Sequence, residues 1–207
     1  MESADQPSAE NEPRKRLKPG ERRLQILQGL AAMLEQPGAE RITTAALAAR
    51  LGVSEAALYR HFASKAQMFE ALIDYIEAST FTLVNQVQDR AAAQGLSGAQ
   101  QVQLIATLTV EFAEKNPGMC RVMVGDALVL EHARLQERMN LYFDKLESSF
   151  KQCLRDITSP TPTVAANTCA SAVTALLMGR LQRYVRSGFK RPASHQIKES
   201  LALMLSM

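Results

Sequence analysis

Apolar residues recur at intervals of three and four along most of this 207-residue chain, and this spacing constrains the fold more than any other feature. It places the apolar side chains on one face of an α-helix. Aromatic residues make up only 5% of the chain and Trp is absent, so the composition lacks the bias of a sheet protein. We therefore predict an all-α fold of about nine helices and no strand.

Breaks in this pattern predict where the helices begin and end. Pro37-Gly38 ends a first helix that begins near Glu21, and Ser64 caps a long helix that runs to about Gln88. The apolar run of residues 135–157 predicts either a packed helix or a coiled-coil-like seam. The other helices are expected at about residues 43–51, 54–62, 100–115, 164–187 and 194–207, with a short segment that ends near residue 130.

Several classes of protein are disfavoured by what the sequence lacks. No run of about 18 apolar residues occurs, and the acidic start is unlike a secretory signal. The three Cys residues are far apart, so we expect them to be buried apolar residues of a cytoplasmic protein rather than disulfide or zinc ligands. Motifs for nucleotide binding and hydrolysis are also missing. We expect no enzyme, no cofactor, no metal site and no membrane association.

The charge is concentrated near the start of the chain. Residues 14–65 hold ten bases against four acids, and six of the bases fall between Arg14 and Arg23. Such a block suits a polyanion, although a solvated tail would look the same. We predict a disordered segment over residues 1–20 with a basic arm at 14–20, followed by a helical head over 21–80 and a helical body over 81–207.

The strongest local signal lies between Thr43 and Lys65, where two short helices are followed by a long one. Ala48 is a small residue at the expected contact of the two short helices, and Gly52 supplies the turn between them. This spacing predicts a helix-turn-helix, with an ordinary helical hairpin as the alternative. The packing residues would be Leu47, Val53 and Leu58, and the exposed face would carry Glu55, Ala56, Tyr59 and Arg60.

The same stretch resembles the DNA-binding domain of the TetR family. The resemblance is carried by Leu51-Gly52-Val53-Ser54, by Ala57-Leu58-Tyr59-Arg60-His61-Phe62 and by Ser64-Lys65. It implies a homodimer that binds a palindromic site in double-stranded DNA. The resemblance also implies a DNA-binding domain over residues 21–80 and a helical dimerisation and partner-binding domain over 81–207. Thr44, Tyr59 and Lys65 would hold phosphates, and Glu55, Ala56 and Arg60 would face bases. The full implied set of DNA-binding residues is Thr43, Thr44, Ser54, Glu55, Ala56, Tyr59, Arg60, His61 and Lys65.

Three stretches of the body resemble the nucleoid occlusion proteins within that family: residues 114–118, 130–138 and 183–190. This resemblance implies a factor, cytoplasmic and associated with the nucleoid, that antagonises the division protein FtsZ when it is bound to chromosomal sites. Ala46 departs from the pattern, because the family resemblance implies a Lys that contacts DNA at this position. The alternative is a ligand-released transcriptional repressor. The body's aromatic residues fall at helical core spacing, which favours packing over a ligand pocket.

The resemblance to nucleoid occlusion proteins also suggests where FtsZ would bind. A groove between the helix after Ser64 and the helix ending at Lys115 would be lined by Tyr75, Leu108, Lys115 and Asn116. An aromatic and an aliphatic side chain beside a base suit a short peptide that is apolar and acidic. Ordinary interhelical packing is the alternative reading.

The last two predicted helices carry the dimerisation hypothesis. The helix of residues 164–187 is rich in small residues that allow a second helix to approach closely, and the last helix adds apolar positions. Packing within one chain would need the same residues, and the family resemblance favours the dimer. The residues concerned are Ala165, Ala166, Ala170, Ala172, Ala175 and Gly179, followed by Ile197, Leu201, Met204 and Leu205.

Overall fold

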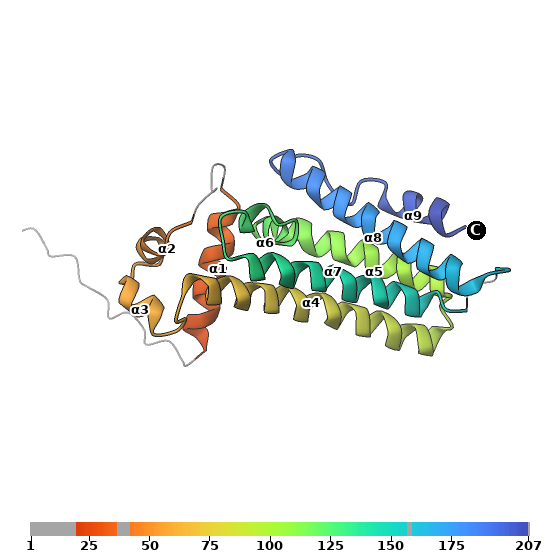
Figure 1. The fold of residues 1–207 in the computed structure, drawn as a ribbon, viewed down its shortest axis with the longest axis horizontal. Helices are drawn as coiled ribbons and strands as arrows, with labels where there is room; N and C mark the ends of the chain where they lie inside the picture. The colour runs from red at the N-terminus through yellow and green to blue at the C-terminus, as the bar shows by residue number, and fades with distance from the viewer. Residues whose placement is uncertain (1–19, 37–41, 157–158, 207) are drawn as a thin grey trace, which may run out of the picture.

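The computed structural model describes residues 20–36, 42–156 and 159–206, and within these ranges the chain is helical with no strand (Figure 1). The predicted all-α fold is confirmed. Residues 1–19, which include the charged residues of the predicted basic arm, lie outside the described ranges. The helices are α1 (Glu21–Leu34), α2 (Thr44–Leu51), α3 (Glu55–Tyr59), α4 (Lys65–Gln94), α5 (Gly98–Lys115), α6 (Pro117–Met123), the 3-10 turn η1 (Asp126–Leu128), α7 (Ala133–Cys153), α8 (Pro162–Arg186) and α9 (Ile197–Leu205).

Side-chain caps explain why these helices begin where they do. The hydroxyls of Thr43, Ser54 and Ser64 each accept a hydrogen bond from the backbone N–H three residues later, at 3.1, 3.2 and 3.2 Å. Such a bond satisfies one of the donors that a helix N-terminus leaves unpaired. Several helix bounds differ from the prediction by a few residues, and two of these differences have a backbone cause. Helix α4 continues to Gln94, because the first residue in the left-handed conformation is Gly95, and α9 begins only after Gln196, whose φ is 52°.

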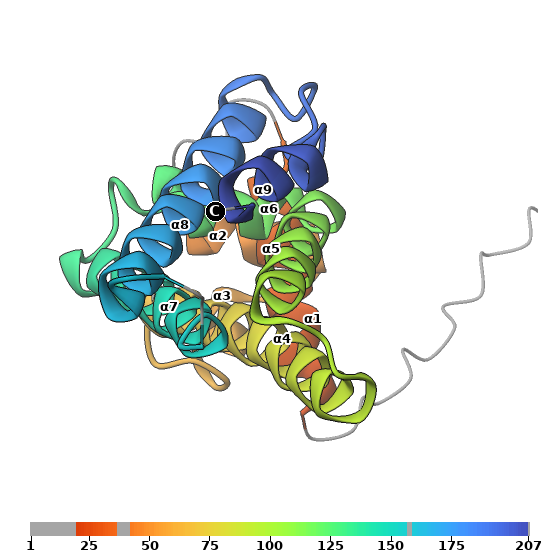
Figure 2. The ribbon, with the colours of Figure 1, turned by 90° about the vertical axis from the view of Figure 1, so that its right-hand side faces the viewer.

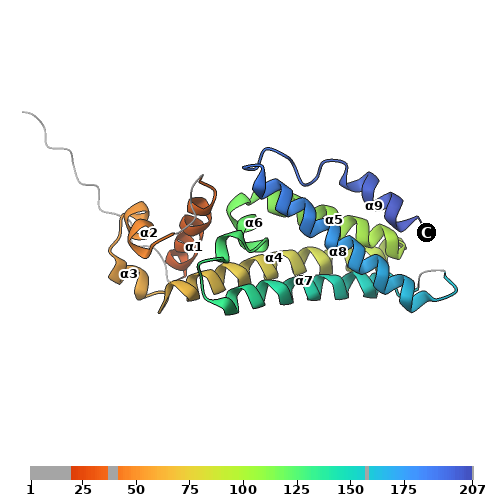
Figure 3. The same cartoon turned by 45° about the horizontal axis from the view of Figure 1, so that its top comes forward.

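The molecule is elongated, with α1, α2 and α3 forming a head at one end and the other helices forming a body (Figure 1). Helix α4 belongs to both parts, since it begins beside α3 and runs the length of the body. Seen from the end, α4, α5, α7 and α8 surround the long axis, and α9 lies outside them beside α5 and α8 (Figure 2). Helix α8 passes obliquely across α5 and α7 (Figure 3). One continuous core of buried apolar residues connects head and body.

The head meets the body through a backbone contact between α1 and α6. A Cβ atom at Gly118 of α6 would lie 2.0 Å from the carbonyl oxygen of Ala31 of α1. No side chain fits in that space, so the glycine lets the two helices touch directly. The head is therefore packed closely on the body along this line.

Helix α8 is long and apolar enough to cross a membrane by length and composition, with a mean hydropathy of 1.3 over 18 residues, of which 39% are buried. The core helices of soluble proteins have the same character. Val173, Leu177 and Leu181 are fully buried against the rest of the body. We therefore interpret α8 as a core helix that leaves one face uncovered.

The cysteines are mostly buried, as predicted. Cys120 and Cys169 are buried and Cys153 is half-buried. Desolvation by burial, with the nearby charge of Glu114 as a smaller cause, raises the pKa of the Cys120 thiol to about 12. A thiol in this state is a poor nucleophile, and Cys120 therefore acts as a core residue.

Candidate nucleic-acid interface and partner groove

Helices α2 and α3 form a helix-turn-helix. Gly52 follows α2 in the left-handed conformation with φ 63°, which a β-carbon would disfavour. Leu47, Ala48 and Leu58 are buried between the helices, and Val53 packs against them. The predicted turn and packing set are therefore confirmed.

A polar cluster holds α3 against the start of α2. The hydroxyl of Thr44 donates to a carboxylate oxygen of Glu55 at 2.6 Å, and the Tyr59 hydroxyl donates to Thr44 at 3.4 Å. Tyr59 nevertheless remains 46% exposed. The sequence assigns all three residues to DNA contacts, and the structure brings them together at the surface.

The outward face of α3 is exposed at Glu55 and Ala56. Arg60 is exposed at the C-cap of the helix, and His61 after it is half-buried. The carbonyl oxygen of His61 accepts a hydrogen bond from Arg23 at 2.5 Å. The Arg23 guanidinium also lies 4.1 Å from the centre of the Phe62 ring, a cation–π contact. Arg23, which the sequence places in the basic block, thus fixes the end of α3. This role spans 38 residues of chain, so no local pattern could have indicated it.

Lys65, the predicted phosphate ligand at the start of α4, forms an ion pair with Glu131 of the segment before α7. The two side chains are 25% and 12% exposed. Sequence reasoning missed Glu131, because the pair joins residues 66 positions apart. A DNA phosphate would have to compete with this carboxylate for the Lys65 ammonium.

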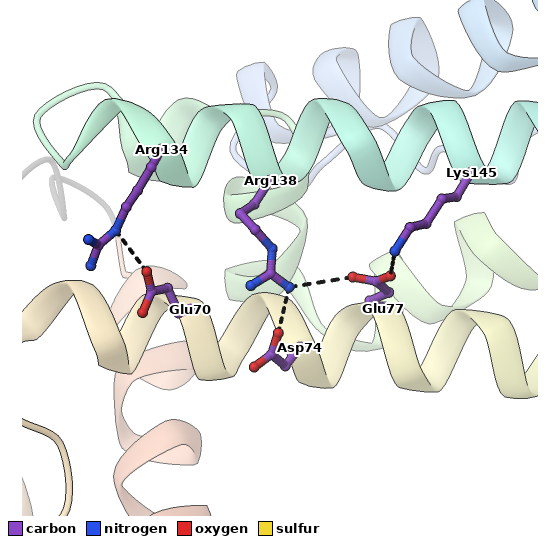
Figure 4. Close-up of polar contacts among 6 residues, drawn as sticks. All are labelled: Glu70, Asp74, Glu77, Arg134, Arg138 and Lys145. Carbon is purple, nitrogen blue, oxygen red and sulfur yellow. Dashed lines mark hydrogen bonds and ion pairs between the residues drawn. The ribbon is translucent and has the colours of Figure 1, made fainter.

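Beyond the Lys65–Glu131 pair, a row of charge contacts joins α4 to α7 (Figure 4). Arg134 pairs with Glu70 at 2.8 Å, and Arg138 pairs with Asp74 at 2.6 Å and with Glu77 at 3.6 Å. The hydrogen bond that Arg138 donates to Asp74 is the main reason that the pKa of Arg138 is raised, and the charges of Asp74 and Glu77 add to it. We call these contacts, with the Lys145–Glu77 pair, the α4–α7 ladder.

The residues of the predicted partner groove come from α4 and α5, which are joined by the turn at Gly95 and run antiparallel (Figure 1). At 1.5 Å of rise per residue, Tyr75 lies about 29 Å from the end of α4 and Lys115 about 26 Å from the start of α5, so the two are level. Leu108 lies about 10 Å nearer the turn. Tyr75 is 44% exposed, Lys115 is exposed and Leu108 is half-buried. The Asn116 side chain donates to the Phe112 carbonyl at 2.8 Å.

The uncovered face of α8 is made of small and apolar residues. Val164 is 62% exposed and Met178 is 45% exposed, and no atom lies within 4 Å of a Cβ atom built on Gly179. The predicted small residues divide into two groups: Ala166 and Ala170 are buried within the chain, whereas Ala172 and Ala175 are exposed. On α9, Ile197 and Leu201 are likewise buried, whereas Leu203 is 79% exposed.

Comparison with known proteins first establishes the class. Residues 26–72 match the family model of bacterial regulatory proteins of the tetR family. A TetR transcriptional regulator from Legionella pneumophila has the same fold, with a TM-score of 0.71 at 14% identity over 91% of this chain and 98% of that one. The transcriptional regulator FadR from Bacillus subtilis, solved in complex with stearoyl-CoA, gives a TM-score of 0.69 at 12% identity over 88% of this chain and 97% of that one. The fold and the helix-turn-helix are those of a TetR-type DNA-binding regulator.

Comparisons that include the body then identify the family within this class. Residues 98–206 match the SlmA-like C-terminal domain of tetracyclin repressor-like proteins. Nucleoid occlusion factor SlmA from Marinomonas sp. (strain MWYL1) is 46% identical over 84% of this chain and 87% of its own length. SlmA from Colwellia psychrerythraea is 44% identical over 93% and 96%. The chain belongs to the nucleoid occlusion factor SlmA family. It is thus a regulatory DNA-binding protein and not an enzyme, as predicted.

Proposed function

We propose that this chain binds a palindromic DNA site as a homodimer and, when bound there, antagonises assembly of the FtsZ ring over the nucleoid. Helix α4 carries the proposal, because it begins at Lys65 beside the helix-turn-helix and presents Tyr75 further along the same rigid element. The proposed units are the domain of residues 21–80 and the body of residues 81–207. The protein would be cytoplasmic and associated with the nucleoid.

DNA binding is assigned to α3 and the residues that support it. Glu55 is exposed on α3 and Arg60 at its C-cap, where an inserted recognition helix would meet base edges. Thr44, Tyr59 and Lys65 lie around it with hydroxyl and ammonium donors for phosphates. The capping residues Thr43 and Ser54 have a structural role in the free protein, since their side chains accept hydrogen bonds from Ala46 and Ala57.

Dimerisation is assigned to the uncovered face of α8 together with α9. Small residues at Ala172, Ala175 and Gly179 would let a partner helix approach closely, and Leu203 would add apolar area. A two-fold axis through this face would present two copies of α3 to half-sites about 34 Å apart, one turn of B-DNA.

FtsZ binding is assigned to the groove of α4 and α5, with its C-terminal tail as the occupant. Tyr75 is a large exposed aromatic side chain level with the cation Lys115, and Leu108 extends the apolar surface. The tail would be a short peptide with apolar and acidic residues, because burial of its anchors and charge pairing with Lys115 then act together.

The DNA assignment is tested by mobility shifts over a series of salt concentrations. Arg60→Ala should relax base preference, and Lys65→Ala should weaken all sequences alike and reduce the salt slope by about one. Wild-type affinity in both variants would show that the assigned reading face is wrong.

The FtsZ assignment is tested by fluorescence anisotropy with a labelled FtsZ tail peptide, with and without operator-like DNA. Lys115→Asp should abolish peptide binding and leave DNA affinity intact, whereas Lys115→Arg should retain binding and Lys151→Asp should control for the change of net charge. Unchanged binding by Lys115→Asp would overturn the groove assignment. No FtsZ binding by the wild type would favour a ligand-released repressor.

A further inference from the structure

A cleft lies between the C-terminal end of α8 and the segment that leads to α9. Its volume is about 470 Å³, which falls within the range of small-molecule sites. It is open to solvent on one side and concave, unlike the exposed face of α3. The lining residues are Arg180, Arg183, Lys190, Arg191, Pro192, His195 and Gln196.

The cleft is strongly basic, and its charge is uncompensated. Four lining residues are cations and none is an acid. Among the described residues, no carboxylate forms an ion pair with Arg183, Lys190 or Arg191. Within the described part of the chain, Arg180 donates only to neutral groups, the His195 carbonyl and, at 2.8 Å, the Ser200 hydroxyl. The α4–α7 ladder shows the contrast, because its bases Arg134, Arg138 and Lys145 are each paired with an acid.

The backbone that carries these bases is fixed by specific contacts. The Ser187 hydroxyl accepts hydrogen bonds from the backbone N–H groups of Lys190 at 3.1 Å and Arg191 at 2.9 Å. Further along, Ser194 donates through its N–H and its hydroxyl to the two carboxylate oxygens of Glu114, at 2.7 and 2.9 Å. The segment is therefore held at both ends, and the bases project from a defined scaffold.

Backbone strain is concentrated in the same segment. Phe189, with φ 64°, and Gln196, with φ 52°, are the only residues other than glycine with positive φ in the described part of the chain. Phe189 is held in place by a hydrogen bond from its N–H to the Tyr184 carbonyl at 3.0 Å and by ring contact with Tyr184 at 5.2 Å. Strained residues persist where the surrounding structure over-determines them, and they cluster at ligand-binding positions.

We propose that this cleft binds a small polyphosphate, such as the triphosphate group of a nucleotide or inorganic triphosphate. Arginine guanidinium groups present a planar fork that matches phosphate oxygens in pairs. Four cations also match the three to four negative charges of a triphosphate near neutral pH. A concave site between a helix end and a loop fits a compact anion better than the extended backbone of duplex DNA, which the head can follow.

The proposal is tested by isothermal titration of the full chain with sodium triphosphate, with ATP and with GTP, in buffer free of divalent cations. The double variant Arg183→Glu/Lys190→Glu reverses two exposed charges and should weaken triphosphate binding by at least about tenfold. Arg90→Glu/Lys151→Glu makes the same charge change outside the cleft and should weaken triphosphate binding less than about twofold. Tighter binding of the nucleotides than of inorganic triphosphate would identify a nucleotide as the ligand class.

Thermal unfolding and analytical ultracentrifugation establish that both double variants fold and keep the assembly state of the wild type. If the cleft variant is misfolded, the single variants Arg183→Gln and Lys190→Gln take its place, because they remove a charge without reversing it. Each should weaken triphosphate binding about threefold. The proposal is overturned if wild type does not bind triphosphate, or if both double variants lose affinity equally. It is also overturned if the cleft variants lose duplex DNA affinity and keep triphosphate affinity, because the bases would then belong to the DNA surface.

Discussion

Toward α7, helix α4 presents Glu70, Asp74 and Glu77, and each of these acids pairs with a base of α7 (Figure 4). On another side of the same helix, Tyr75 follows Asp74 by one residue, about 100° around the axis, and is 44% exposed. One flank of α4 is therefore closed by complementary charges, and the other offers an aromatic side chain level with the C-terminal end of α5.

The difference indicates how one long helix can serve two purposes. Exposed ion pairs contribute little each, so the ladder chiefly fixes the register of α7 on α4. The Tyr142 hydroxyl, which donates to Thr80 at 3.0 Å beneath this flank, adds a buried polar contact that specifies the same pairing. The α5 flank has no comparable charge pairing in the described residues, which leaves it available to a partner.

The largest effect is expected on the open flank. Tyr75→Ala should weaken FtsZ tail binding by about tenfold or more, because an exposed aromatic anchor is lost, while the melting temperature stays unchanged. Leu141→Ala is the matched control, since Leu141 is a 55% exposed apolar residue on α7. Anisotropy titrations of both variants check this. Equal losses in the two would show that the two flanks do not differ in partner binding.

On the closed flank, Arg138→Met should lower the free energy of unfolding by about 1 kcal/mol, because two carboxylates lose their shared partner. Urea unfolding measures this free energy, and about 1 M salt should reduce the difference between variant and wild type by screening the charges. Arg155→Met serves as control, since the Arg155 side chain is 72% exposed and, among the described residues, pairs only with its neighbour Asp156. A loss of peptide binding in Arg138→Met would contradict the separation of the flanks.

Tyr142→Phe should also cost about 1 kcal/mol at neutral pH, through loss of the hydrogen bond to Thr80. Burial is the main cause of the raised pKa of Tyr142, whose ordinary value is 10.0. As pH rises above 10, the unfolded chain releases the phenolic proton while the folded chain retains it, so wild-type stability falls. Unfolding measured from pH 8 to 11 should show a shallower fall for Tyr142→Phe, and identical slopes would argue against this origin.

The smallest effect is expected where the ladder meets the head. Glu131→Gln should raise DNA affinity by about twofold to threefold, because Lys65 no longer has to leave an ion pair to reach a phosphate. Mobility shifts at low salt measure this change, with Glu137→Gln, an exposed acid of α7, as control. Weaker DNA binding by Glu131→Gln would show that the pair positions Lys65 for DNA instead of competing with it.

How far the sequence predicts this molecule depends on the range of the interactions involved. Helix starts at Thr43, Ser54 and Ser64 follow from local hydrogen bonds, and the helix-turn-helix follows from the spacing of Ala48 and Gly52, so both were predictable. The contacts of Lys65 with Glu131 and of Arg23 with His61 join distant segments, and no pattern marks them. The partner groove was indicated only by family resemblance, because an exposed Tyr and Lys occur on many helices.

The direct contact of Gly118 with Ala31 has a consequence for engineering. In many regulators a DNA-reading head can be imagined as an exchangeable module, to be grafted onto another body to change the target site. Here α6 of the body packs directly on the main chain of α1. A foreign head would have to reproduce that backbone path and also a base on α1 that, like Arg23, contacts the end of α3. A chimera should therefore keep α1 with the body and exchange only the outward residues of α3. The target sequence would then change while the contact between head and body stays the same.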